Sequence, residues 1–346
     1  MFITGLGTSV PQPRHTQREC WEAIRASSQY AALSSRSHAI LRKVLMGNNG
    51  IEARHLALDP LSEAFDFTPD AMHARFKRVA PQIGAEAARR ALVESGRKPE
   101  EIGALVVATC TGYLCPGLSS YIGERLGLPR NAQLLDLVGL GCGAAVPALR
   151  TASALLGETE NVLAICLEVC SAAMYLDDDP GVLISACLFG DGAAAVIGSR
   201  KPQPGVRDVR MTRAESLHVP EAREKLRFEH RHGLLRNILA ADVPVLSAGF
   251  AADVLARADI APAEISEWLF HSGGRDVLRE IVKRIGLSEH AVRHSTEVLR
   301  EYGNMSSPSC LFSLRRALDE NAAGGKWWLA SFGAGFSSHG AILEVR

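Results

Sequence analysis

The chain has 346 residues, too many for one simple core and suited to two packed units of similar size. Its composition, 47% hydrophobic and 22% charged, is that of a globular protein and excludes a largely disordered or fibrous chain. Lys and Arg number 38 and Asp and Glu also number 38, so the formal net charge is zero and no overall positive field attracts nucleic acid or an anionic membrane. We therefore expect a globular protein of a size that permits an enzyme, with no nucleic-acid partner.

The N-terminal residues and the cysteines both point to the cytoplasm. Residues 1–7 lack a basic segment and contain glycines, so they predict an opening strand rather than a signal peptide. No run of about 18 apolar residues is free of charge, which predicts no transmembrane span. The 8 cysteines show neither C-x-x-C spacing nor the density of a small secreted scaffold, so we expect reduced thiols, most of them buried.

The first clear elements along the chain are a helix and a buried strand. Residues 83–96 carry apolar side chains at helical spacing and stop at Gly96, which predicts a helix. Residues 104–109 form a short apolar run with β-branched residues, which predicts a buried strand. The segment from about residue 27 to residue 78 is rich in Ser, Arg and His and predicts no regular element.

The same order of elements recurs later in the chain. Residues 251–258 predict a helix and residues 267–272 a strand, and Pro262 occupies the place that Pro99 has in the first copy, 163 residues earlier. Short strands that alternate with helices in two related halves are typical of an α/β protein. Chance similarity between two stretches of this kind is the alternative.

Glycine-containing segments close both halves, at residues 189–197 and 332–343. Between them, residues 200–205 contain two prolines and a glycine and form the clearest linker in the chain. We therefore predict an N-terminal unit of residues 1–202 and a C-terminal unit of residues 203–346.

Cys142 is the strongest candidate nucleophile. It follows an apolar stretch, lies between Gly141 and Gly143, and precedes residues that predict a helix. At the N-terminus of a helix, unpaired N–H groups and the macrodipole favour thiolate over thiol, and flanking glycines let a substrate approach. A buried structural cysteine at a helix–sheet junction is the alternative.

A nucleophilic thiol needs a proton partner, and His271 is the best placed histidine. It follows the apolar run at residues 268–270 and precedes Ser272 and two glycines, so we expect it at the end of a strand. Asn304 follows Gly303 and precedes small residues that begin a helix, where a simple helix cap would also explain it.

Taken in order, five motifs of this sequence resemble the signatures of type III polyketide synthases, the chalcone and stilbene synthase family. The resemblance runs from about residue 83 to the C-terminus, and the set as a whole is specific although no single motif is. The motifs are Gly-Cys-Gly-Ala-Ala at residues 141–145, Leu-Phe-Gly-Asp-Gly-Ala-Ala-Ala at 188–195, His-Ser-Gly-Gly at 271–274, Tyr-Gly-Asn-Met-Ser-Ser at 302–307, and Phe-Gly-Ala-Gly-Phe at 332–336.

The resemblance implies a thiolase fold, in which two duplicated βαβαβαββ halves form a five-layered α-β-α-β-α arrangement, and it implies a homodimer. By position, Cys142 matches the family nucleophile, His271 the family histidine and Asn304 the family asparagine. Phe189 matches the first of two gatekeeper phenylalanines, and Ser306 falls in the same motif as Asn304, where we expect a substrate contact.

The family chemistry uses acyl-CoA and malonyl-CoA as substrates and requires neither a cofactor nor a metal. Cys142 would take an acyl group from CoA, and donors from His271 and Asn304 would hold the enolate formed by decarboxylation of malonyl-CoA. Basic residues on an N-terminal helix would meet the phosphates of CoA, for which Arg42 and Lys43 are the nearest candidates. An ordinary solvated helix face explains these two residues equally well.

Several departures from the plant pattern bear on the substrate. The second gatekeeper position offers Arg236 or Asn237 instead of phenylalanine, and Cys110 stands where plant enzymes have a cavity-lining threonine, as in bacterial relatives. Small residues at the other lining positions leave room for a long acyl tail, which a bulky side chain turned inward would close. These lining residues are Cys170, Ala173 and Ser185, and the bulky candidates are Met174 and Tyr175.

We therefore expect a type III polyketide synthase that joins a starter acyl-CoA to malonyl-CoA and cyclises the chain to an alkylpyrone or alkylresorcinol-type product. One alternative is an enzyme that uses malonyl-CoA alone and makes a tetrahydroxynaphthalene or phloroglucinol-type product. A second is an enzyme similar to ketoacyl-ACP synthase III, which takes its extender from acyl carrier protein. The third is a catalytically silent thiolase-fold subunit that only binds.

Overall fold

The computed structural model describes residues 1–346. Nine of its thirteen strands form one sheet that divides into two parts, because β1 and β8 share only the pair Phe2 and Arg210. The first part has the strand order β1 (Phe2–Ser9), β7 (Gly192–Ser199), β6 (Asn161–Glu168), β4 (Ala104–Ala108) and β5 (Gln133–Leu137). The second part has the order β8 (Val209–His218), β13 (Ser337–Val345), β12 (Gly325–Gly333) and β11 (Ile265–Phe270).

The two parts repeat one pattern of pairing. In the first, β1 and β6 both run antiparallel to β7, and β4 runs parallel to β6. In the second, β8 and β12 both run antiparallel to β13, and β11 runs parallel to β12. Only β5 has no counterpart. The structure therefore contains the duplication that the repeated order of elements indicated.

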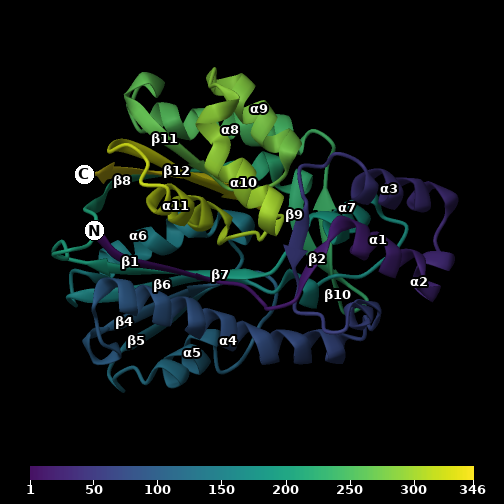
Figure 1. Cartoon of the computed structure of the whole chain (residues 1–346), viewed down its shortest axis with the longest axis horizontal. Coiled ribbons are helices and arrows are strands. Elements are labelled where there is room, and N and C mark those ends of the chain that lie inside the picture. Colours follow the sequence, from purple (N-terminus) through teal and green to yellow (C-terminus); the bar gives the residue numbers. More distant parts are fainter.

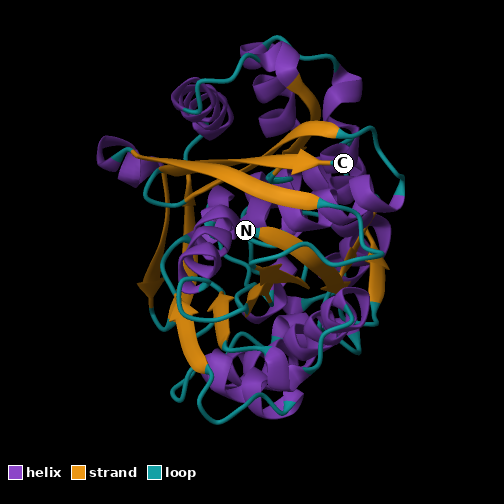
Figure 2. Cartoon of the chain, turned by 90° about the vertical axis from the view of Figure 1, so that its left-hand side faces the viewer, coloured by secondary structure: helices purple, strands orange, loops and turns teal.

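Each of the two parts, called the first and the second sheet from here on, has helices on its outer face, and further helices lie between the two (Figures 1 and 2). The layers run from outer helices through the first sheet, central helices and the second sheet to a further outer pair, so the expected five-layered α-β-α-β-α arrangement is confirmed. The outer helices on the first sheet are α4 (Pro69–Ser95) and α5 (Leu118–Leu126), the central helices are α6 (Ala145–Leu155) and α11 (Ser309–Asp319), and α8 (Val243–Arg257) and α9 (Arg275–Ile285) cover the second sheet.

Two predicted helices are longer than their sequence patterns indicated. The helix expected from residue 83 begins at Pro69, where the side chain of Thr68 accepts a hydrogen bond from the N–H of Ala71, and it ends at Gly96 with φ +63°. The helix expected over residues 251–258 begins at Val243. In both, the missed turns lie N-terminal to the clearest apolar repeat.

A third group of elements gathers at one end of the sheets, opposite the two chain termini (Figure 1). It includes the segment around residues 27–78 for which the sequence predicted nothing regular. The elements are β2 (Arg14–Thr16), α1 (Gln17–Arg25), α2 (Ser28–Ala31), α3 (Ser35–Met46), β3 (Ala53–His55), α7 (Pro180–Leu188), and the hairpin β9 (Leu226–Arg231) and β10 (Leu234–Leu239). The helix α10 (Arg293–Tyr302) packs against α11, β3 and β11. The short 3-10 turns are η1 (Leu61–Phe65), η2 (Pro99–Glu101), η3 (Gly141–Gly143), η4 (Cys170–Ala172), η5 (Pro220–Lys225), η6 (Pro262–Glu264) and η7 (Glu289–Val292).

No helix combines the length and the apolar character needed to cross a bilayer.

Candidate active site

Cys142 lies in the turn η3, between the edge strand β5 and the helix α6. Gly139 and Gly141 in this turn have φ +80° and +54°, a region that glycine enters without the steric cost of a Cβ. The chain therefore reverses sharply and places Cys142 just before the N-terminus of α6, as the sequence predicted.

The C-terminal end of β12 packs against this turn from the second half of the molecule. The hydroxyl of Ser331 donates a hydrogen bond to the carbonyl of Gly143 at 2.8 Å. A Cβ on Gly333 would lie 2.5 Å from the nitrogen of Gly143 and 3.0 Å from that of Cys142. Only glycine fits at position 333, so the two halves meet backbone to backbone beside the thiol.

Ser306 connects Asn304 to Cys142. Its hydroxyl donates to the sulfur of Cys142 at 3.1 Å, and its N–H donates to Oδ1 of Asn304 at 2.8 Å. Ser306 has φ +61°, an uncommon conformation for a residue with a Cβ, and the hydrogen bond to Asn304 helps to hold it there. Nδ2 of Asn304 donates to the carbonyl of Gly273 at 3.0 Å, which leaves one of its two N–H groups free.

His271 lies directly after β11, at the strand end that the sequence predicted. The residue is 2% exposed, its ring meets that of Phe332 edge-on at a centroid distance of 5.2 Å, and its Nδ1 has no hydrogen-bond partner. Burial lowers the pKa of His271 to about 4, and a contact with the backbone of Ser306 partly opposes this shift. The imidazole is therefore neutral near pH 7.

The ionisation of Cys142 differs from the expectation based on its place before a helix. Burial raises the pKa of the Cys142 thiol to about 12, and the hydrogen bond from Ser306 offsets only part of that increase. The position at the helix N-terminus is as expected, but the enclosed surroundings penalise charge more strongly. Near pH 7 both groups are therefore uncharged, with Cys142 as a thiol and His271 as a neutral imidazole.

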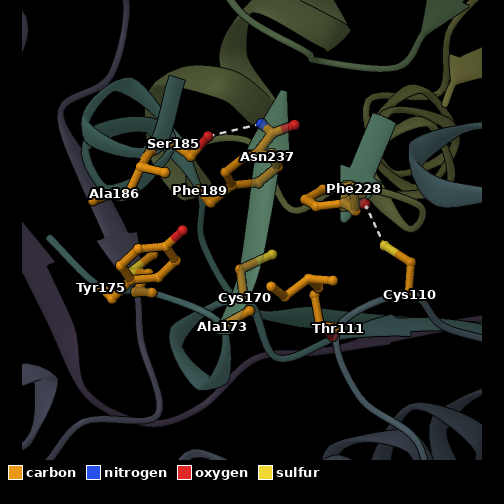
Figure 3. A pocket seen from close by; sticks show the side chains of 14 residues that line it. Cys110, Thr111, Cys170, Ala173, Tyr175, Ser185, Ala186, Phe189, Phe228 and Asn237 are labelled. Atoms are coloured by element: carbon orange, nitrogen blue, oxygen red, sulfur yellow. Dashed lines mark hydrogen bonds between the residues drawn. The ribbon is translucent and has the colours of Figure 1, made fainter. Parts of the chain in front are cut away.

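Phe189, Cys110 and Ser306 line one small cavity, with about 40 Å³ of free space (Figure 3). Phe189 follows α7, and its backbone forms a β-bridge with Asn304. The sulfur of Cys110 lies 3.6 Å from the hydroxyl of Ser306. The lining positions expected from the sequence are all present in this cavity, namely Cys170, Ala173, Met174, Tyr175 and Ser185.

The structure decides between the two residues considered for the second gatekeeper position. Asn237 lines the cavity, whereas Arg236 does not and forms ion pairs with Asp179 and Glu229. Consecutive residues of a strand point to opposite faces, so only one of the two can face the cavity. Phe228, which pairs with Asn237 across the β9–β10 hairpin, also lines the cavity and was not expected there.

Arg42 and Lys43 do not belong to this cluster. Both are exposed on α3, which packs on α1 and α7, and neither forms an ion pair. The structure thus brings Cys142, His271, Asn304, Ser306, Phe189 and Cys110 together and leaves the two basic residues at the surface.

Glu168 is a site residue that the sequence analysis missed. It is fully buried at the end of β6 and accepts hydrogen bonds from the N–H of Cys110 at 2.9 Å and from the hydroxyls of Thr111 at 2.9 Å and Ser307 at 2.7 Å. Burial raises its pKa despite these bonds. Glu168 therefore ties the loop after β4 to the segment that carries Ser306. In the sequence it is only a carboxylate at the end of an apolar strand, which by itself does not indicate a site.

No group of three or more His, Cys, Asp and Glu side chains is arranged to hold a metal ion.

A second small apolar cavity, also with about 40 Å³ of free space, adjoins the first. The two share Met174, Tyr175 and Ala186 as lining residues. The second cavity extends under α1 and η1, where it is lined by Cys20, Ala23, Ile24, Arg54, Leu56, Leu58, Leu61, Ala64, Phe65, Phe67 and Leu176.

Comparisons with known proteins agree with this arrangement. Residues 57–202 match the family model for the N-terminal domain of chalcone and stilbene synthases, and residues 255–345 match that for the C-terminal part of 3-oxoacyl-[acyl-carrier-protein] synthase III. The chain is 32% identical to a 3,5-dihydroxyphenylacetyl-CoA synthase of Streptomyces toyocaensis, over 92% of this chain and 83% of that protein. It is 28% identical to the alpha-pyrone synthesis polyketide synthase-like Pks18 of Mycobacterium tuberculosis, over 99% of this chain and 91% of that protein.

The fold agrees with a solved structure as well. The 1,3,6,8-tetrahydroxynaphthalene synthase of Streptomyces coelicolor, a bacterial type III polyketide synthase, superposes with a TM-score of 0.87 at 24% identity, over 100% of this chain and 99% of that one. This likeness confirms the thiolase fold, and the relatives confirm the family. The protein is an acyltransferase that belongs to the type III polyketide synthases, the family of the chalcone and stilbene synthases.

Proposed function

We propose that this synthase transfers the acyl group of a starter acyl-CoA to Cys142, extends it with malonyl-CoA, and releases an alkylpyrone or alkylresorcinol-type product. The observation that carries this choice is the apolar lining of two adjoining cavities, the first of which includes Cys110 and Ser306. Of the 14 residues that line the second cavity, 13 are hydrophobic, which suits an alkyl chain and offers little to a polar ligand.

In the first step, the sulfur of Cys142 attacks the thioester carbonyl of the starter. The new carbon–sulfur bond joins the acyl group to Cys142, the bond to the sulfur of CoA breaks, and the thiol proton passes through His271 to the departing CoA thiolate. The buried, neutral imidazole of His271 suits this role, because it has a nitrogen without a partner and is free to take a proton.

In the second step, malonyl-CoA loses carbon dioxide and leaves an enolate. The free N–H of Asn304 and an N–H of His271 would donate to the enolate oxygen in a site with little water. The enolate carbon then attacks the carbonyl of the acyl-Cys142 thioester, so that a carbon–carbon bond forms and the Cys142 sulfur leaves. The chain, now two carbons longer, is carried by CoA.

We place the CoA phosphates near α3, with Arg42 and Lys43 as their contacts. The segment that follows α3 reaches the turn after His271, where the guanidinium of Arg275 donates to the carbonyl of Asn48. A CoA whose thioester reaches Cys142 past this turn would pass the exposed face of α3. The two free cations there support the assignment.

We also propose a homodimer that forms through β5. This strand ends the sheet with a free edge, and Leu134, Val138 and the nearby Tyr113 are 44%, 60% and 71% exposed. An edge strand with exposed apolar side chains favours pairing with a second copy. The cytoplasm is the proposed compartment, which agrees with eight cysteines in the free thiol state.

A malonyl-CoA-only synthase that makes a tetrahydroxynaphthalene or phloroglucinol-type product is the second candidate. It is favoured by the Streptomyces toyocaensis relative, whose name gives a dihydroxylated aromatic product without an alkyl chain. Met174 and Tyr175, at the junction of the two cavities, would confine a short chain to the first cavity in that case.

Product analysis by liquid chromatography and mass spectrometry separates the two candidates. The protein is incubated with malonyl-CoA alone and with malonyl-CoA plus starters from acetyl- to palmitoyl-CoA. The proposal expects products whose mass follows the length of the starter. A single aromatic product of constant mass, formed equally well from malonyl-CoA alone, would replace it with the second candidate.

A further inference from the structure

Asn237 carries a buried polar atom that no group of the protein satisfies. The residue is 5% exposed on β10, lines the cavity next to Phe189 and Phe228, and its Oδ1 has no hydrogen-bond partner. Buried polar atoms are almost always paired, so an orphaned acceptor in a substrate cavity calls for an explanation. Figure 3 shows this oxygen turned away from Ser185, toward the side of the cavity where Phe228 lies.

The neighbouring serine fixes which atom of the amide is free. The hydroxyl of Ser185 lies 2.6 Å from the carbonyl of Gly181, a contact between two oxygens that needs the hydroxyl proton between them. That hydroxyl has no second proton, so toward Asn237, at 2.8 Å, it can only accept. The amide atom facing Ser185 is therefore Nδ2, and the unpaired atom is the oxygen.

An oxygen acceptor in this place is available to a donor from the substrate. The surroundings of Asn237 are mostly apolar, since 10 of the 14 lining residues are hydrophobic. A saturated alkyl tail has no donor, and a ketone oxygen would meet Oδ1 with lone pairs on both sides. A β-keto chain presents a donor only where one of its ketones is in the enol form.

We propose that Oδ1 of Asn237 is a specificity-determining subsite that accepts a hydrogen bond from an enol hydroxyl of the growing poly-β-keto chain. The inference rests on the proposed function, because such a chain exists only if the protein extends a thioester with malonyl units. By pairing with one enol, Asn237 selects which ketone of the chain is enolised and where the chain lies when it cyclises. It thereby influences which ring forms and leaves the loading of Cys142 to other residues.

The test compares Asn237→Leu with Phe228→Leu. Leucine has nearly the shape of asparagine but no polar atom. Phe228→Leu, at the cross-strand neighbour of Asn237, is the control that changes the volume of the lining without changing its polarity. For each variant, intact-protein mass spectrometry follows acylation of Cys142, a coupled assay gives the rate and the KM of malonyl-CoA decarboxylation, and chromatography gives the ratio of cyclised products.

We expect Asn237→Leu still to load acyl groups and to decarboxylate malonyl-CoA, while the ratio of the main ring product to the other products changes about 5-fold, the size expected for one hydrogen bond. Phe228→Leu should change the length of the chain and keep the type of ring. Asn237→Val is the second variant if leucine does not pack, and acyl loading verifies its fold.

An unchanged product ratio in a variant that still loads Cys142 would overturn the inference and leave the proposed function intact. A raised KM for malonyl-CoA with an unchanged product ratio would also overturn it. The group that donates to Oδ1 of Asn237 would then be an amide N–H of the CoA arm and not an enol hydroxyl of the chain. If the parent makes no polyketide from any acyl-CoA or from malonyl-CoA alone, it is the proposed function that fails.

Discussion

The two halves of the sheet place different chemistry at equivalent positions. In the first half, the chain between β4 and β6 carries Cys142 just before α6. In the second half, the chain between β11 and β12 carries Asn304 shortly before α11, and His271 follows β11 directly. One duplicated scaffold thus supplies the proposed covalent nucleophile from one copy and the proposed hydrogen-bond donors from the other. Ser306 joins them through its bonds to Cys142 and Asn304.

The halves also differ at their outer edges. β5 extends the first half and leaves an edge with exposed apolar side chains, whereas β11 ends the second half and is covered by α10 and η7. A single substitution can test each difference: the separate chemical roles of the two halves, and the pairing of the free edge of β5.

Asn304→Ala should have the largest effect. Loss of one donor to the enolate should lower the rate of malonyl-CoA decarboxylation about 100-fold or more, because such donors act where charge develops. Acylation of Cys142 should continue at a rate close to that of the parent. Radioactive carbon dioxide release and intact mass measure the two steps separately.

Cys142→Ala is the matched variant from the other half, and it should lose acylation but retain decarboxylation. If Asn304→Ala lost both steps equally while its thermal unfolding was unchanged, the division of labour between the halves would be wrong.

Acidification should destabilise the second half through two buried histidines. Burial lowers the pKa values of His271 and His339 to about 4, below the value of 6.5 for an exposed histidine. The folded state therefore binds fewer protons than the unfolded state, so the stability is complete above pH 6.5 and is lost as the pH falls through 4. Each group accounts for on the order of 2–3 kcal/mol of this loss.

Thermal unfolding between pH 7 and pH 4 measures that loss. His339→Gln should flatten the decline relative to the parent, since one of the two titrating groups is absent. A decline of equal slope in both proteins would assign the acid sensitivity to other groups.

Val138→Lys should have the smallest effect and concerns only assembly. Val138 is 60% exposed beside the free edge, and a lysine there should weaken pairing of two β5 strands. Light scattering after size exclusion should show the parent at twice the mass of one chain and the variant partly at the mass of one chain. Val93→Lys, at an 82% exposed site on α4, is the control and should leave the mass unchanged. A parent that elutes as a monomer would contradict the proposed interface.

The sequence predicted those features that depend on short stretches of chain. The repeated helix and strand around Pro99 and Pro262 could be predicted because each buried strand is a continuous apolar run. The turn at Cys142 could be predicted because glycines flank the cysteine. The division into residues 1–202 and 203–346 stays a prediction, and it falls between the end of β7 at Ser199 and the start of β8 at Val209.

Features that depend on contacts between distant segments could not be predicted from the sequence. Glu168 became a site residue only when the loops at residues 109–111 and 306–307 met around it. The ionisation of Cys142 was expected in the wrong direction, because a helix terminus is visible in a sequence and the degree of enclosure is not. The helix α3 was missed because Ser, Arg and His interrupt its apolar face.

Intact-protein mass spectrometry after incubation with a panel of acyl-CoAs tests the proposed chemistry most directly. We expect an acyl adduct on the parent, absent from Cys142→Ala, with the strongest signal for starters whose alkyl chain fills the two apolar cavities. An adduct that persists in Cys142→Ala, or no adduct from any acyl-CoA including malonyl-CoA, would contradict the assignment of Cys142 as the nucleophile of this synthase.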